Sequence, residues 1–252
     1  MAPPDAPSVT GAPASNGRVD DLLAVSGLGA GYGSRQVVFD VNVRVGKGEV
    51  VLVLGHNGAG KTTLLKSVFG LLRPFQGAVH YLGDDVTRQS CASRVRRGMA
   101  FIPAERAVFG DLSVLENLKL GAIGVPAPEV SRRLEWINAL FPVLAERRTQ
   151  AAATMSGGQQ RMLSLGIALM SEPKLLLVDE PSLGLSPKLV QEVMDKIREL
   201  ADTVGLSVLM LEQNVIQGLR VADRVYVIRS GRLLLEETAE QMRARGQWWD
   251  LF

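Results

Sequence analysis

The chain has 252 residues, of which 46% are hydrophobic and 21% are charged, and its formal net charge is +2. This composition is typical of a globular protein with a large core, and without a dense Lys/Arg stripe the charge gives no reason to expect nucleic acid as a partner. Cys91 is the only cysteine, which excludes an internal disulfide and favours a reducing compartment.

Residues 1–20 are rich in Pro, Ala, Ser and Gly and lack the apolar region of a secretory signal. Because they have almost nothing to bury, they are predicted to form a disordered tail. No stretch approaches the roughly 20 apolar residues of a membrane span, so any membrane role requires a partner. Residues 246–252 are predicted to be a C-terminal tail, whose adjacent tryptophans, Trp248 and Trp249, we expect to pack on the domain.

An ordered domain is predicted from residue 21 to residue 245. Residues 41–45 alternate between apolar and polar side chains, as a half-buried strand does, and residues 46–48 form a turn. Residues 49–55 are continuously apolar, which predicts a strand that is buried on both faces. A helical pattern follows at residues 61–72, and "GAVHYLG" and "GMAFIP" predict two further short strands.

The region from about 111 to 170 is predicted to be a helical subdomain inserted into this α/β core. It contains a capping box formed by Ser113 and Glu116. A helical stripe of apolar side chains follows, at Val130, Leu134, Ile137 and Phe141.

The core pattern resumes with a predicted strand at residues 174–180. A helix is expected to begin at Pro187 with Ser186 as its N-cap. Its apolar face is predicted to consist of Leu189, Val193, Ile197 and Leu200. The segment "VGLSVLMLEQN" is the next predicted strand, and "RVYVIRSGRLLLE" predicts a hairpin that turns at Ser230-Gly231.

The segment "GHNGAGKTT" fits the phosphate-binding pattern G-x-x-x-x-G-K-[ST] and has the required strand before it and helix after it. Glycines let successive backbone N–H groups point at phosphate oxygens, and the helix N-terminus adds partial positive charge. Lys61 is expected to bind the β- and γ-phosphates, and the Thr62 hydroxyl is expected to bind Mg²⁺. The predicted nucleotide-binding residues here are Gly55, His56, Asn57, Gly58, Ala59, Gly60, Lys61, Thr62 and Thr63.

Two carboxylates end the predicted strand at residues 174–180. Asp179 is expected to hold Mg²⁺, directly or through water, and Glu180 is expected to act as the general base for the attacking water. A phosphate loop elsewhere in the same chain favours this hypothesis over an acidic pair that only leaves the sheet.

The segment "MSGGQQR", residues 155–161, lies upstream of Asp179. Together with the two motifs above, it resembles the ATP-binding-cassette family, whose signature matches Ser156, Gly157, Gly158 and Gln159. The resemblance runs from about residue 22 to residue 245. It implies an α/β P-loop NTPase (RecA-like) core with a mixed sheet, an N-terminal antiparallel β-subdomain and an inserted helical subdomain.

The resemblance also implies a partner cassette, because the family's signature closes on the ATP held by a second P-loop. Ser156 and two glycines that open a helix make a second anion-binding helix N-terminus. Tyr32 is similar to the family's adenine-stacking aromatic, although local packing in a turn is an alternative. Residues 182–187 resemble the segment that contacts the other subunit.

The segments "FIPAERAVFGDLSVLENLKLG", "DEPSLGLSP" and "LEQN" are similar to ATPase subunits of importers for branched-chain amino acids, amides, urea and related small polar or aromatic solutes. This resemblance implies a cytoplasmic protein, peripheral on the inner face of the cell membrane. Its implied partners are a homologous, non-identical ATPase subunit, two membrane permease subunits and, indirectly, a periplasmic or extracellular solute-binding protein. Solute selectivity resides in those partners, so this sequence does not name the solute.

Two positions depart from the general family pattern. Ala104 occupies the place of a glutamine that contacts Mg²⁺ and water, so either Glu105, which precedes Arg106, replaces it or the contact is missing. Gln213 occupies the place of a histidine that reaches the γ-phosphate. No histidine follows the signature, because the chain has only His56 and His80.

Gln213 can donate a hydrogen bond to phosphate but carries no proton charge, which predicts slow or partner-dependent hydrolysis. Glu212 and Asn214 are expected to be ordinary residues at the edge of the sheet. Two alternatives to an importer ATPase stay open. One is a weakly hydrolysing cassette that acts as the regulatory half of a heterodimer, and the other is a soluble cassette outside transport.

Overall fold

The computed structural model describes residues 21–105, 107–245, 248 and 251. The predicted tail at residues 1–20, Arg106 and Trp249 lie outside the described residues. Trp248 packs against the core, and its indole N–H donates a hydrogen bond to the Met242 carbonyl at 2.9 Å. The predicted packing of this tryptophan on the domain is therefore confirmed.

One sheet is antiparallel and has the strand order β2-β1-β4-β5. Its strands are β1 (Asp21–Tyr32), β2 (Arg35–Gly46), β4 (Gln76–Tyr81) and β5 (Asp84–Asp85). β1 was not predicted as a strand, and its pairing with β2 is interrupted by several register shifts. These bulges break the regular alternation of apolar side chains that would indicate a strand.

The second sheet has the order β10-β9-β3-β8-β7-β6, with every neighbouring pair parallel except β9 and β10. Its strands are β3 (Val50–Leu54), β6 (Met99–Ile102), β7 (Leu175–Asp179), β8 (Ser207–Glu212), β9 (Arg224–Arg229) and β10 (Arg232–Thr238). β9 and β10 form the predicted hairpin. Ser230 and Gly231 have φ of 49° and 77°, the left-handed geometry of a tight hairpin turn.

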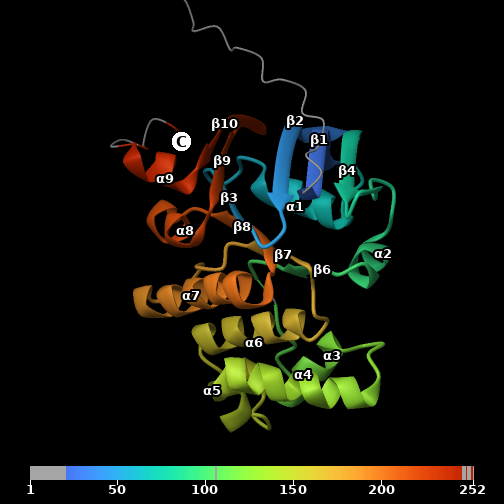
Figure 1. Cartoon of the computed structure of the whole chain (residues 1–252), viewed down its shortest axis with the longest axis vertical. Helices are drawn as coiled ribbons and strands as arrows, with labels where there is room; N and C mark the ends of the chain where they lie inside the picture. The colour runs from blue at the N-terminus through green and yellow to red at the C-terminus, as the bar shows by residue number, and fades with distance from the viewer. Residues whose placement is uncertain (1–20, 106, 246–247, 249–250, 252) are drawn as a thin grey trace, which may run out of the picture.

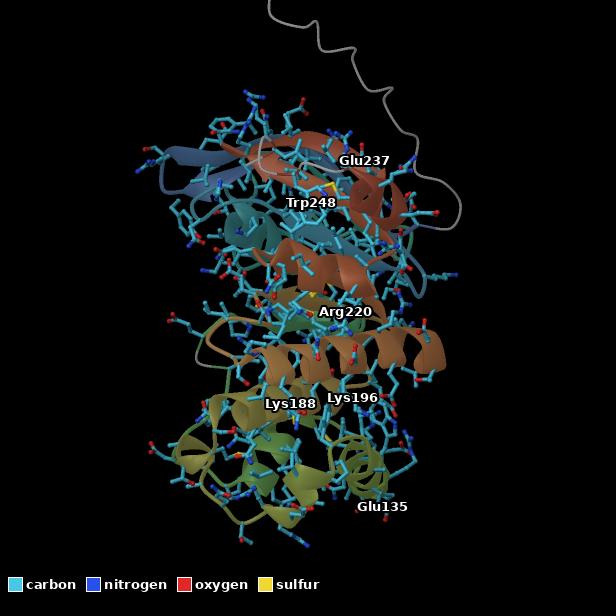
Figure 2. The ribbon with its side chains drawn as sticks, turned by 90° about the vertical axis from the view of Figure 1, so that its left-hand side faces the viewer. Glu135, Lys188, Lys196, Arg220, Glu237 and Trp248 are labelled. Carbon is cyan, nitrogen blue, oxygen red and sulfur yellow. The ribbon has the colours of Figure 1, made fainter. Side chains whose placement is uncertain are left out.

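The described helices are α1 (Lys61–Phe69), α2 (Cys91–Arg96), α3 (Val114–Gly121), α4 (Ala127–Leu140), α5 (Pro142–Glu146), α6 (Gly157–Leu169), α7 (Pro187–Val204), α8 (Val215–Val221), α9 (Ala239–Ala244) and the short 3-10 helix η1 (Ala152–Thr154). Figure 1 shows α3 to α6 gathered at one end of the molecule, away from the antiparallel sheet. Figure 2 shows Lys188 and Lys196 along α7, with Arg220 on α8 above them.

The parallel strands of this sheet are buried on both faces, because alternate residues of these strands belong to two different core clusters. Leu52 and Leu54 pack in the cluster shared with α3, α6 and α7. Val51 and Val53 pack in the cluster shared with α1 and the antiparallel sheet. The continuous apolar runs in the sequence follow from this double burial.

The helical layer has the expected local signals. The Ser113 and Glu116 capping box is present at α3, and Ile137 and Phe141 of the predicted α4 stripe are buried. The predicted fold class, a P-loop NTPase core with mixed and antiparallel sheets, is confirmed by this architecture. Among the described residues, no helix has the length and apolar character to cross a bilayer.

Candidate nucleotide-binding and hydrolysis site

The Gly-rich loop begins at the carboxyl end of β3 and leads directly into α1. Gly58 and Gly60 have φ of 79° and 104°, a conformation that favours glycine. A Cβ at Gly55 would lie 2.4 Å from the carbonyl oxygen of Ile228, so only glycine fits there. Behind the loop, the Gly231 N–H donates to the Ala59 carbonyl at 2.9 Å, which links the loop to the β9–β10 turn.

The first turn of α1 leaves its backbone donors available. Gly60 is the N-cap and provides no side-chain hydrogen bond, so uncapped N–H groups and the helix dipole both favour an anion here. A cavity of about 130 Å³ lies at this point. It is lined by Val37, His56, Asn57, Gly58, Gly60, Lys61, Thr62, Thr63 and Glu180.

Lys61 is only 4% exposed and lies inside this loop. Its ammonium donates to the carbonyls of Gly55 at 2.6 Å and His56 at 3.2 Å, and it lies 3.5 Å from Glu180 Oε1. The lysine charge is therefore already positioned between the phosphate loop and the candidate base.

Asp179 is 3% exposed, and its Oδ1 accepts a hydrogen bond from the Thr62 hydroxyl at 3.4 Å. Burial raises the pKa of Asp179 above its ordinary value, and the neighbouring Glu180 adds to this, whereas the Thr62 bond and Lys61 act in the opposite direction. A cation between Thr62 and Asp179 would favour the ionised carboxylate. Two oxygen donors beside a phosphate site are the protein ligands that Mg²⁺ usually accepts, so these residues fit the metal.

Glu180 follows β7 with a left-handed backbone, φ 47°, which is uncommon outside glycine and costs about 1–3 kcal/mol. The surroundings hold this conformation. The Glu180 N–H donates to the Leu211 carbonyl at 3.0 Å, and its own carbonyl accepts from Leu183 N–H at 3.1 Å. The guanidinium of Arg161 on α6 also donates to the Glu180 carbonyl, at 3.3 Å.

Gln213 faces the site from the end of β8. Its side-chain amide donates to Glu180 Oε1 at 2.7 Å and to Asn57 Oδ1 at 2.6 Å. The structure thus brings Gln213, the candidate base and the phosphate loop together, although these residues come from three separate parts of the sequence.

Glu212 does not have the position that the sequence suggested. It was expected at the sheet edge, but it is 1% exposed, and its carboxylate accepts four hydrogen bonds. Burial raises its pKa above the ordinary value, and the hydrogen bonds oppose that shift. Asn214 also has a defined task, because its side chain caps α8 by accepting from Gln217 N–H at 3.2 Å. The expectation of an ordinary edge residue was therefore wrong for Glu212, whereas Asn214 is exposed as expected, and only its role as the cap of α8 was not predicted.

Ala104 and Glu105 do not line the phosphate-loop cavity. The Ala104 carbonyl accepts a hydrogen bond from Arg161 at 2.8 Å, so its backbone supports the same arginine that holds Glu180. Glu105 is exposed and lines a separate hollow of about 270 Å³ beside Gly157.

The signature residues open α6. Ser156 is the N-cap, and it forms a capping box with Gln159 that was not predicted. A Cβ at Gly158 would lie 2.6 Å from Leu189 Cδ1, so α6 and α7 approach closely there. The residues from Ser156 to Gln159 are not part of the phosphate-loop cavity of their own chain.

Tyr32 ends β1 at the tip of the β1–β2 hairpin and is 48% exposed. The hairpin approaches the phosphate loop, because a Cβ at Gly60 would lie 2.8 Å from Val38 Cγ1. Tyr32 itself does not line the cavity.

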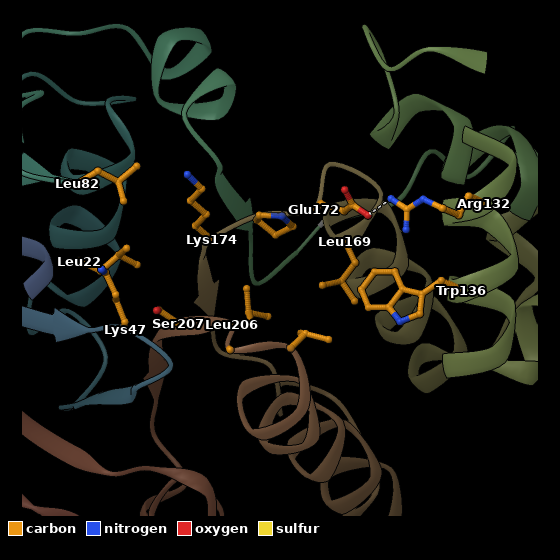
Figure 3. A pocket seen from close by; sticks show the side chains of 13 residues that line it. Leu22, Lys47, Leu82, Arg132, Trp136, Leu169, Glu172, Lys174, Leu206 and Ser207 are labelled. Carbon is orange, nitrogen blue, oxygen red and sulfur yellow. Dashed lines mark hydrogen bonds and ion pairs between the residues drawn. The ribbon is translucent and has the colours of Figure 1, made fainter. Parts of the chain in front are cut away.

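A different hollow, of about 670 Å³, lies at the amino-terminal ends of the parallel strands, opposite the end from which the phosphate loop begins (Figure 3). Lys174 and Ser207, on the amino-terminal side of β7 and β8, lie on one wall, and Trp136 of α4 lies on the other. It shares no lining residue with the phosphate-loop cavity, so it is not part of the nucleotide site.

These features together define an ATP-binding-cassette ATPase. They are a phosphate loop, a Thr62–Asp179 pair, a carboxylate after β7 and a signature helix on an inserted helical layer. Residues 38–183 match the family model described as ABC transporter. The chain belongs to the ABC transporter family.

Two relatives extend over nearly the whole domain. A high-affinity branched-chain amino acid transport ATP-binding protein, BraG, of Pseudomonas aeruginosa is 41% identical over 86% of this chain and 93% of its own length. A probable branched-chain amino acid transport ATP-binding protein, LivF, of Archaeoglobus fulgidus is 37% identical over 88% of this chain and 94% of its own length.

The fold is also similar to solved structures. A nucleotide-free ATP-binding cassette from an ABC transporter matches with a TM-score of 0.81 at 25% identity, covering 88% of this chain and 94% of that one. An ATP-binding cassette of an ABC transporter in its ADP conformation matches with a TM-score of 0.82 at 25% identity, over 92% and 98%. The predicted family, ATP binding and ATP hydrolase activity are confirmed.

Proposed function

We propose that this chain is the ATP-hydrolysing subunit of an importer for branched-chain amino acids or related small polar or aromatic solutes. The observation that carries the proposal is the 41% identity with BraG, which extends over 86% of this chain. That span includes a hydrolysis site in which the phosphate loop, Asp179, Glu180 and Gln213 adjoin one another.

The roles of the loop residues follow from their positions. Backbone N–H groups of residues 55–63 receive the phosphates, and Lys61 moves its ammonium from the Gly55 carbonyl to the β- and γ-phosphate oxygens. Thr62 and Asp179 hold Mg²⁺, which when bound neutralises phosphate charge. Tyr32, exposed at the hairpin tip beside the loop, stacks on the adenine ring.

Glu180 acts as the general base. Its Oε1 accepts a proton from water as the water oxygen forms a bond to the γ-phosphorus and the bond to the ADP oxygen breaks. In the structure this oxygen accepts from the Gln213 amide, so the amide must turn towards the phosphate to release it. Because the amide is neutral, it stabilises the transition state less than an imidazolium would.

The signature residues Ser156, Gly157, Gly158 and Gln159 act on a second nucleotide. Their helix N-terminus provides anion-binding donors, but they do not line the cavity of their own chain. This arrangement supports pairing with a second ATPase subunit, whose ATP lies against this signature. We propose a homologous, non-identical partner, as the resemblance to the branched-chain importer subunits implies.

A groove beside the helical layer supports a membrane partner. It has a volume of about 780 Å³, and two of its apolar lining residues, Val95 and Ile123, are 41% and 80% exposed. We place here a cytoplasmic helix of one of two permease subunits, which would make this chain a peripheral protein on the inner membrane face. A solute-binding protein would contact the permease from outside.

The groove has a direct test. Ile123→Glu should reduce co-purification with the permease at least tenfold, because a buried charge replaces an apolar contact, while the basal ATPase rate stays unchanged. Ile216→Glu on α8 is the matched control, since Ile216 is 61% exposed outside this groove. Equal retention of both variants would contradict the placement.

The solute proposal is tested in membrane vesicles that contain the assembled transporter and its binding protein. Leucine, isoleucine and valine should stimulate ATP hydrolysis and enter the vesicles in an ATP-dependent manner. If none of these amino acids stimulates hydrolysis but an amide, urea or an aromatic acid does, the transported solute would belong to that other class.

A further inference from the structure

The carboxylate of Glu212 joins two segments that lie on either side of the hydrolysis site. Its Oε1 accepts from Ser182 N–H at 2.9 Å, and its Oε2 accepts from the Ser182 hydroxyl at 2.8 Å. The same Oε2 accepts from the N–H groups of Gln213 at 3.0 Å and Asn214 at 3.2 Å. One side chain therefore fixes the loop after β7 and the turn after β8.

Both of these segments control the candidate base. Ser182 is two residues from Glu180, whose left-handed backbone persists only when its neighbours hold it in place. Gln213 places its side-chain amide 2.7 Å from Glu180 Oε1. A shift of either segment would move the carboxylate away from the water that it must deprotonate.

We infer that Glu212 is a positioning residue for ATP hydrolysis, which holds Glu180 and Gln213 in register without touching the nucleotide. The inference rests on the proposed function in that Glu180 is taken as the base. It adds a link between the hydrolysis site and residues 182–187, the segment proposed to contact the paired cassette, because Ser182 begins that segment.

Glutamine cannot replace this carboxylate. The four bonds require two acceptor oxygens, and an amide offers one oxygen and one NH₂ group. In either orientation of the amide in Glu212→Gln, its NH₂ group faces a backbone N–H group that donates to the carboxylate in the wild type, so two donors meet without an acceptor. We expect the turnover number to fall about tenfold, the usual range for residues that orient a reactive group, while the ATP dissociation constant changes less than twofold. Glu212 is not part of the cavity that receives phosphate.

Ser207→Ala is the matched control, because Ser207 is buried at the other end of the same strand and its hydroxyl accepts from Gly48 N–H at 2.9 Å. It should lower the melting temperature but leave the turnover number within twofold. Ser182→Ala removes one of the four bonds and should lower the turnover number about threefold; combined with Glu212→Gln, it should add nothing further.

Hydrogen exchange provides a readout that is independent of turnover and of transport. In the full-length chain, Glu212→Gln should accelerate amide exchange in residues 182–186 at least tenfold, and Ser207→Ala should not.

Unchanged exchange, or an unchanged turnover number, in folded Glu212→Gln would overturn the inference. Parallel loss of ATP affinity and turnover in Glu212→Gln and Ser207→Ala would also overturn it. If Glu212→Gln does not fold, Ser182→Ala decides: unchanged exchange and turnover reject the role. Failure of solute uptake would refute only the importer assignment.

Discussion

At the scale of single residues, the candidate hydrolysis site is held together by short polar contacts between separate segments. Gln213 contacts both Asn57 of the phosphate loop and the carboxylate of Glu180. The ammonium of Lys61 lies 3.5 Å from Oε1, the same carboxylate oxygen that accepts from Gln213. An amide and an ammonium therefore contact the candidate base, Glu180, and no histidine of this chain follows β8.

Gln213→His should increase the turnover of the assembled transporter by about tenfold or more, because a preorganised charged donor commonly contributes about 10²–10³ in rate. Steady-state ATP hydrolysis measures the effect. Gln217→His, one turn further along α8, is the control and should change nothing. An unchanged or lower rate for Gln213→His would show that the amide is adapted to this site.

Asp179 predicts a pH dependence of stability in the nucleotide-free protein. Burial raises its folded-state pKa, so the folded state binds the proton more tightly and the wild type loses stability as the pH rises above the ordinary aspartate value of about 3.9. Asp179→Asn cannot ionise. The free energy of unfolding of the variant minus that of the wild type should therefore increase between about pH 4 and pH 7.

Urea denaturation across this pH range measures that difference in the free energy of unfolding. Adding Mg²⁺ and ATP should make the wild type the more stable of the two proteins. A cation beside the carboxylate stabilises its ionised form, and only the wild type has this carboxylate. A difference that is independent of pH would contradict the assigned burial effect.

At the scale of elements, the sequence predicted those parts whose signals are local. The phosphate loop, the buried strands β3 and β7, the helix that begins at Pro187 and the hairpin turn at Ser230-Gly231 each have a continuous pattern of apolar or turn residues. β1 escaped prediction because glycines and bulges interrupt its alternation.

The position of Glu212 could not be predicted for a different reason. A polar residue after a buried strand looks the same in the sequence whether it points to solvent or inward. Its hydrogen-bond partner Ser182 is 30 residues away in the chain, and the pairing of β7 with β8 brings the two residues together. Likewise, nothing local in the sequence indicated that Arg161 would support Glu180.

The packing of α3 on α6 gives a prediction at this scale. A Cβ at Gly121 would lie 2.1 Å from the Ile167 carbonyl oxygen, a backbone atom that cannot turn aside. Gly121→Ala should therefore lower the free energy of unfolding by about 1–3 kcal/mol, as overpacking does. Gly157→Ala is the control, because its nearest neighbour would be Leu185 Cδ2 at 3.6 Å. Equal stability of the two variants in chemical denaturation would contradict the close approach.

At the scale of the whole molecule, the fold separates the phosphate loop from the signature helix. The loop is at the carboxyl end of β3, and the signature opens α6 in the helical layer (Figure 1). We therefore propose that each chain contributes two half-sites, which a second cassette completes. In the proposed assembly, the exposed apolar groove beside α2 and α3 would couple the pair to the membrane subunits.

We propose that this chain hydrolyses ATP itself, with Glu180 as the general base. The most direct measurement is the ATPase rate of the transporter assembled with wild-type chain and with Glu180→Gln, using the exposed Glu240→Gln as the control. We expect a loss of about 10²–10⁴-fold for Glu180→Gln and none for the control, because the general base is removed. A rate within twofold of the wild type would contradict it and assign hydrolysis to the partner's site.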